Sequence, residues 1–128
     1  DDTLLYVGCD DESDEQFADF KALETELQAL TTVDGKPYRL LKLPMPDKMV
    51  FDGERLPATY ANFLVINGAV IVPVYGQSEK DEEAKTLVAE AFPGREIIAV
   101  DASVIVRQHG SIHCLTMQLP KGMIKTNL

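Results

Sequence analysis

The 128-residue sequence predicts an α/β fold built from repeated modules. The order strand, acidic loop, helix and strand occurs twice, and the second copy lies about 65 residues after the first. Asn67-Gly68, which is typical of a tight β-hairpin, adds one more strand at the start of the second copy. Internal repetition of this kind indicates a modular or circular fold.

The first copy begins with the apolar run 4–7, which predicts a buried strand. Ser13 and Gln16 have the spacing of a capping box, which predicts that a helix starts there. The returning strand is expected at residues 38–43. Apolar residues recur at helical spacing and predict one buried stripe on the helix: Phe17, Phe20, Leu23, Leu27 and Leu30.

The second copy is predicted to contain a strand at 62–66, the hairpin turn and a strand at 69–74. Ser78 can cap the helix that follows, and the returning strand is expected at 96–100. Residues 47–57 mix charge with little periodicity, which predicts a loop between the two modules. The inward face of this helix is predicted to consist of Ala84, Leu87, Val88 and Ala91.

In the first copy, residue 1 lies where the hairpin turn would be, so the opening strand of that module is expected upstream. We therefore expect this chain to be the C-terminal part of a single, longer domain. Its modules are expected at about 1–55 and 56–108, with a third opening at 109–128. Exposed strand edges should make the isolated chain prone to association.

The composition excludes several classes of function. The net charge of −9 argues against a nucleic-acid surface. This charge would favour a cationic small molecule, but acids on solvated helix faces and near turns, which keep a protein soluble, are the stronger explanation. There is neither an apolar run for a membrane span nor a signal peptide, so we expect no membrane partner and a cytoplasmic location. The two cysteines form no disulfide framework, and Cys9, at the end of an apolar strand, is expected to be a buried, inert thiol.

Residues 109–114, His-Gly-Ser-Ile-His-Cys, hold both histidines of the chain and Cys114, the candidate nucleophile. If residues 111–119 form a strand, His113 points away from the thiol and is expected to pack or hydrogen-bond beneath the site. His109 could bend back toward the thiol. Gly110 permits either close approach of a ligand or simply a bend.

The same segment offers the ligand types of a zinc site, His109, His113 and Cys114. Its interior is a poor helix, however, and no second cysteine pair is present, so no metal is expected. The sequence contains neither a nucleophile elbow for a Ser-His-Asp triad nor a glycine-rich phosphate loop. From these residues alone, Cys114 remains a candidate nucleophile without an identified base.

Residues 110–114, Gly-Ser-Ile-His-Cys, resemble the nucleophile motif of the agmatine deiminase and bacterial-type peptidyl-arginine deiminase family. The resemblance extends along essentially the whole chain, with matching order and spacing. The other strings that carry it are Leu43-Pro44-Met45-Pro46, residues 56–63 (LPATYANF), Asn67-Gly68, Ile71-Val72-Pro73 and residues 92–96 (FPGRE).

The resemblance implies the pentein fold, an α/β-propeller of five strand-hairpin-helix-strand modules, of which this chain would cover about two. In the family, the catalytic histidine lies in a His-x-Asp motif just upstream of the position where residue 1 lies, and the guanidinium-binding acids lie further upstream. The resemblance therefore implies that these 128 residues are inactive alone.

The implied reaction is hydrolysis of agmatine to N-carbamoylputrescine and ammonia, a step toward putrescine, with Cys114 as the covalent catalyst. Gly110 and His109 would line the substrate pocket, no cofactor is implied, and a homo-oligomer is possible. Relatives often carry glycines where this chain has Arg107-Gln108-His109, so peptidyl arginine or another arginine derivative remains an alternative substrate. Asn62 and Tyr60 match fixed family positions and are expected to have structural roles. A non-catalytic binding or structural segment is the second alternative.

Overall fold

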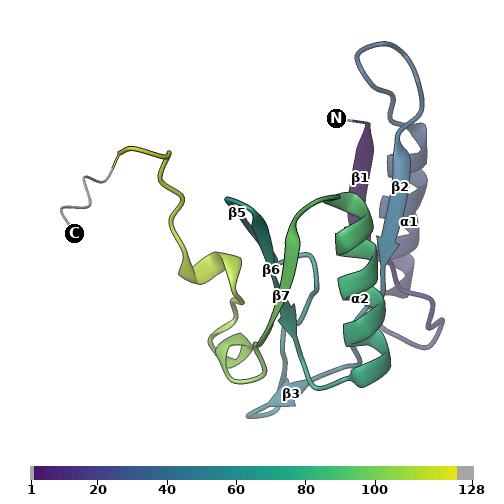
Figure 1. Ribbon diagram of the computed structural model, residues 1–128. Helices are drawn as coiled ribbons and strands as arrows, with labels where there is room; N and C mark the ends of the chain where they lie inside the picture. The colour runs from purple at the N-terminus through teal and green to yellow at the C-terminus, as the bar shows by residue number, and fades with distance from the viewer. Residues whose placement is uncertain (1, 124–128) are drawn as a thin grey trace.

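The computed structural model describes residues 2–123 and shows a mixed α/β chain with the predicted order of elements (Figure 1). None of its helices is long and apolar enough to cross a membrane within the described range. The long helices are α1 (Phe17–Ala29) and α2 (Ser78–Ala91), and two 3-10 turns follow at Ile105–Gln108 and His113–Leu115. The strands are β1 (Thr3–Val7), β2 (Arg39–Leu43), β3 (Val50–Phe51), β4 (Glu54–Arg55), β5 (Leu64–Ile66), β6 (Ala69–Val74) and β7 (Glu96–Asp101).

The first repeat is a βαβ unit in which α1 connects the parallel strands β1 and β2, with Leu5 opposite Leu41. The predicted capping box is wrong, because α1 starts only at Phe17 and no side chain caps it. Acidic side chains shape the preceding loop instead, since Asp11 Oδ1 accepts hydrogen bonds from the backbone and hydroxyl of Ser13. The apolar stripe of α1 is only partly covered, because Leu23 remains 39% exposed.

The second repeat contains the extra strand that the Asn67-Gly68 signal predicts. Strands β5 and β6 pair antiparallel with Ile66 opposite Ala69, so Asn67 and Gly68 form a two-residue turn. Helix α2 then connects β6 to the parallel strand β7. The predicted cap at Ser78 is wrong, because the N-cap is Gln77 and its side chain makes no capping bond.

The segment predicted as a plain loop at 47–57 contains a short hairpin. Strands β3 and β4 pair antiparallel, with Phe51 opposite Glu54. Both turn residues have positive φ, 52° at Asp52 and 83° at Gly53, which is the backbone that an Asp-Gly hairpin turn requires. The Asp-Gly dipeptide was therefore an available signal for this hairpin.

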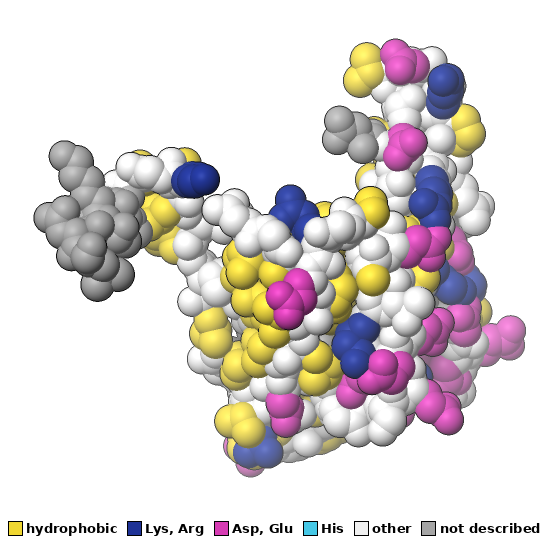
Figure 2. Space-filling model, viewed as in Figure 1, with side chains coloured by type: hydrophobic (Ala, Val, Ile, Leu, Met, Phe, Trp, Pro, Cys, Tyr) yellow, Lys and Arg dark blue, Asp and Glu magenta, His cyan; other side chains and the backbone are white. Residues whose placement is uncertain are grey.

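Helix α2 lies between the sheets β1–β2 and β5–β6–β7 and contacts both, as Figure 1 also shows. Its residues Ala84 and Val88 are fully buried in the hydrophobic core, together with Leu43 of β2 and Val72 of β6. The two repeats therefore share one core. On the face seen in Figure 2, hydrophobic side chains gather over the sheet β5–β6–β7, and Ile98 of β7 is among the exposed large hydrophobic residues.

The strand predicted at residues 111–119 is wrong. After β7 the chain forms two 3-10 turns and then an extended arm, which Figure 1 shows leading away from the sheets. Ile112, at the start of the second turn, is buried in the core. Ile112, one of the apolar residues that predicted a strand, thus holds a turn in place instead. Because residues 113–115 form a turn, His113 and Cys114 do not follow the alternation of side-chain directions in a strand.

Candidate active site

Cys114 lies in the second 3-10 turn, His113–Leu115, and this turn directly follows two buried residues. Ser111 and Ile112 are 1% and 8% exposed, whereas Cys114 is exposed to solvent. The turn is also held from outside the segment, because the backbone N–H of His113 donates to Asn62 Oδ1 at 2.7 Å. The buried residues Ser111 and Ile112, which we call the stem, therefore support the exposed thiol of Cys114.

The thiol of Cys114 has a polar partner in the segment just before β5. Asn62 Nδ2 donates to Cys114 Sγ at 3.2 Å. This hydrogen bond, followed by one with the Ser111 backbone, lowers the pKa of the Cys114 thiol below its ordinary value. Cys9, in contrast, is 3% exposed, which confirms the prediction of a buried thiol. Cys114 is thus the more reactive of the two cysteines on physical grounds.

Gly110 lies against the thiol-bearing residue. A Cβ atom at this position would be 3.1 Å from the Cβ and 3.6 Å from the Sγ of Cys114. Such a contact is tighter than ordinary van der Waals packing, so either Cys114 or the added methyl group would have to shift. The glycine therefore permits a close approach between the two residues.

His109 does not lie beside the thiol in this structure but faces the β3–β4 hairpin. It has a left-handed backbone, with φ of 64°, and its Nε2 atom is 3.5 Å from Glu54 Oε2. Arg107 stacks its guanidinium over the ring of Phe51 at 4.7 Å. The prediction that His113 packs beneath the site is wrong, because His113 is exposed.

A buried polar network lies beneath the turn. The hydroxyl groups of Ser111 and Tyr75 are 3.1 Å apart, and Tyr75 also donates to the carbonyl of Thr59 at 3.0 Å. The backbone N–H of Tyr75 donates to Asp81 Oδ1, which in addition accepts the hydroxyl of Tyr60 at 2.7 Å. The network thus connects the start of α2 to the residue three positions before Cys114.

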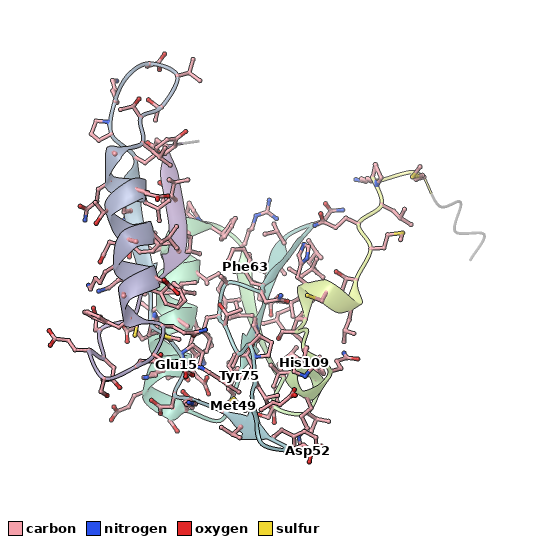
Figure 3. All side chains as sticks on the ribbon, turned by 180° about the vertical axis from the view of Figure 1, so that it is seen from behind. Glu15, Met49, Asp52, Phe63, Tyr75 and His109 are labelled. Atoms are coloured by element: carbon pink, nitrogen blue, oxygen red, sulfur yellow. The ribbon has the colours of Figure 1, made fainter. Side chains whose placement is uncertain are left out.

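A cavity of about 760 Å³ opens between α1, the β3–β4 region and the segment before β5. Figure 3 shows three of its lining residues, Glu15, Met49 and His109, around the same end of the molecule. Gly110 and Cys114 do not line this cavity, although Ala61, which does, directly precedes the thiol's partner Asn62. The cavity therefore reaches Ala61 and His109 but not the thiol itself.

One wall of the cavity is fixed by a bidentate ion pair. Arg55 donates to both carboxylate oxygens of Asp14 at 2.8 Å, and also to Glu15 at 2.9 Å. The guanidinium lowers the pKa of Asp14 to about 2. The pair connects the loop before α1 to the segment that leads to Asn62.

The structure adds residues that the sequence reasoning had not assigned to the site. Asn62 was expected to have a structural role, yet it bonds both the thiol and the backbone beside it. Asp81 had no motif to mark it, although its position in the first turn of α2 is typical of a carboxylate that meets free backbone amides. Within residues 2–123, no cluster of three or more His, Cys, Asp and Glu side chains is placed to hold a metal ion.

Comparisons with known proteins agree on one family. The family model described as Porphyromonas-type peptidyl-arginine deiminase matches residues 1–120. A Marinomonas protein assigned as an agmatine deiminase is 35% identical over 92% of this chain and 36% of its own length.

Solved structures give the same result. A Porphyromonas gingivalis protein assigned as an arginine deiminase superposes with a TM-score of 0.89 at 51% identity, over 94% of this chain and 35% of its own length. The agmatine deiminase of C. jejuni superposes with a TM-score of 0.79 at 40% identity, over 88% of this chain and 33% of its own length. A cysteine-to-serine variant of that C. jejuni enzyme has been solved with substrate bound. The chain thus spans about a third of the relatives that it matches.

Proposed function

Because the chain belongs to the Porphyromonas-type peptidyl-arginine deiminase family, we propose that it carries the nucleophile of a guanidine deiminase, and that this nucleophile is Cys114. The observation that supports this most directly is the state of the two cysteines. Cys114 is exposed on a buried stem and has a lowered pKa, whereas Cys9 is buried. A cysteine nucleophile needs accessibility and a lowered pKa, and Cys114 has both.

The reaction that suits this thiolate is hydrolysis of agmatine to N-carbamoylputrescine and ammonia. The Cys114 sulfur forms a bond to the guanidinium carbon, and one nitrogen of that carbon leaves as ammonia after it gains a proton. Water then adds to the same carbon, the C–S bond breaks, and the thiolate and the ureido product are released. The proton donor and the acids that hold the guanidinium are proposed to lie outside this chain.

Two features of the chain support the proposal that the proton donor and the guanidinium-binding acids lie outside it. Neither His109 nor His113 is followed two residues later by an aspartate, so the His-x-Asp motif implied by the resemblance is not within these 128 residues. The chain also spans only about a third of its relatives. We therefore propose that the 128 residues alone are inactive and that the remaining part of the protein completes the site.

The two repeats of the chain share an order of elements. The unit β5–β6–α2–β7 has the order strand, hairpin, strand, helix and strand, and β1–α1–β2 repeats its last three elements. We propose that these units are two modules, at about 1–55 and 56–108, of a five-module propeller. The third module, proposed for 109–128, extends past the described residues, which end at 123.

Peptidyl arginine is the second candidate substrate. It is favoured by the match of residues 1–120 to the Porphyromonas-type peptidyl-arginine deiminase family and by Arg107 and His109, which stand where the family resemblance implies glycines. Both side chains lie against the β3–β4 hairpin and extend that side of the site. In this proposal, Gly110 and His109 contact the substrate.

The test is ureido-product formation by the complete protein that carries this chain, with agmatine and with an arginine-containing peptide. Turnover of agmatine that is lost in Cys114→Ala and kept in Cys9→Ala would support the proposal. Turnover of the peptide alone would keep the mechanism and change the substrate. If the complete protein produces no ureido product from either compound, a binding or structural role replaces the enzymatic one.

A further inference from the structure

The side chain of Asn62 bridges two atoms of the 3-10 turn His113–Leu115, which carries Cys114 and is called the nucleophile turn below. Its Oδ1 accepts the backbone N–H of His113 at 2.7 Å, and its Nδ2 lies 3.2 Å from Cys114 Sγ. The orientation of the amide is fixed chemically, because a backbone N–H can only donate and must therefore face the oxygen. The NH₂ group is then left to face the sulfur.

This arrangement connects segments that are 52 residues apart in the sequence. Asn62 is half-buried and lies just before β5, whose Leu64 is buried in the core. The amide is therefore supported by a packed element, whereas the thiol that it contacts is exposed. A donor on a rigid support can hold a sulfur atom in one position and stabilise negative charge on it.

We infer that Asn62 is a positioning residue for the reaction, which holds the Cys114 sulfur in place and stabilises its thiolate. This inference rests on the proposed role of Cys114 as the nucleophile. It assigns the two ends of the amide different tasks: the oxygen anchors the turn and the NH₂ group acts on the sulfur.

The electrostatics of the site agree with this assignment. The hydrogen bond from Asn62 is the largest contribution to the lowered pKa of Cys114, ahead of the one with the Ser111 backbone. The groups that lower the pKa of Cys114 are neutral hydrogen-bond partners, the side chain of Asn62 and then backbone groups, and the nearby pKa of Tyr75 is raised mainly by burial. The thiolate at this site therefore depends on neutral donors from this chain.

The two tasks can be separated with Asn62→Asp in the complete protein. Aspartate has nearly the same shape and keeps the acceptor for the His113 N–H, but it places a carboxylate oxygen where the NH₂ group had faced the sulfur. Asn62→Ala removes both bonds. Asn67→Asp, at the exposed turn of the β5–β6 hairpin, is the matched control, because it makes the same chemical change away from Cys114.

The measurement is the pH dependence of alkylation by iodoacetamide, in which the thiolate displaces iodide and forms a thioether. The rate measured for Cys114→Ala is subtracted to remove background. We expect Asn62→Asp to move the midpoint upward by about one pH unit, which is a roughly tenfold slower reaction below the midpoint. Asn67→Asp should keep the wild-type profile. Asn62→Ala should also shift the midpoint upward, but by less than Asn62→Asp because it adds no negative charge.

A profile for Asn62→Asp that coincides with those of wild type and Asn67→Asp would overturn the inference and leave Asn62 with a purely structural role. Because alkylation needs no substrate, this test is independent of whether agmatine is turned over. If Asn62→Ala fails to fold, the isosteric aspartate variant still decides the question. In the complete enzyme, the acidic limb of the kcat profile should shift in the same direction in Asn62→Asp.

Discussion

Three hydrogen-bond donors converge on the carboxylate of Asp81, which is 8% exposed at the start of α2. Its Oδ1 accepts the hydroxyl of Tyr60 at 2.7 Å and the backbone N–H of Tyr75 at 3.1 Å, and its Oδ2 accepts the N–H of Gln77 at 2.8 Å. Asp81→Asn keeps the size of the side chain but leaves one oxygen for three donors.

The expected loss in the free energy of unfolding follows from the hydrogen bond that the NH₂ group of asparagine cannot accept. If its oxygen takes the place of Oδ1, its NH₂ group faces the N–H of Gln77, and such a lost bond costs about 1–3 kcal/mol. The two remaining bonds change from charge-assisted to neutral and weaken by about 1 kcal/mol each. Gln77 is half-buried, so water recovers part of the loss. We expect the free energy of unfolding to fall by roughly 2–4 kcal/mol.

The assay is urea unfolding of the complete protein, with Glu83→Gln as the control. Glu83 is an exposed acid on the same helix, so this control removes one negative charge without touching the network. The control should lie within about 0.5 kcal/mol of wild type. If Asp81→Asn is no less stable than Glu83→Gln, the buried carboxylate does not hold the network and the reasoning is refuted.

Three further outcomes are expected. Gly110→Ala should lower kcat several-fold while leaving the melting temperature nearly unchanged, because its Cβ would lie 3.1 Å from that of Cys114; an unchanged kcat contradicts this. The stabilisation that Asp14→Asn removes should persist from neutral pH to about 4 and disappear as pH falls toward 2, since Arg55 lowers the pKa of that carboxyl in the folded state. A loss already complete at pH 5 in acid unfolding would show that the pair is not formed. Tyr75→Phe should lower the free energy of unfolding in urea by about 1–3 kcal/mol, because its hydroxyl bonds Ser111 and the carbonyl of Thr59. A change near zero, as at an exposed site, would contradict this.

Much of the fold could be predicted because its signals are local. Strand β6 was predicted with both ends correct, since the apolar run 69–74 is bounded by the Asn67-Gly68 turn and by Tyr75-Gly76. The repeat was visible because each βαβ unit needs an apolar run on both sides of an amphipathic helix. The β3–β4 hairpin was missed, although Asp52-Gly53 is a hairpin dipeptide, because its strands are only two residues long.

The site was harder to predict because its contacts are not local. Cys114 could be selected from its sequence context, but the strand assumed around it is a 3-10 turn. That turn depends on Asn62, more than 50 residues earlier, and on burial of Ile112 in a core shared by both repeats. No periodicity in the sequence reports a hydrogen bond between segments so far apart. The contacts of Asn62 with His113 and Cys114 therefore became visible only in three dimensions.

Mass spectrometry of the acid-quenched reaction tests most directly whether Cys114 attacks a guanidinium carbon. The complete protein is mixed with agmatine, quenched within its first turnovers and digested. We predict that the peptide containing Cys114 carries the added mass of agmatine less ammonia, and that the peptide containing Cys9 does not. Turnover of agmatine with an unmodified Cys114 peptide at every quench time, or the adduct on another residue, would contradict the account.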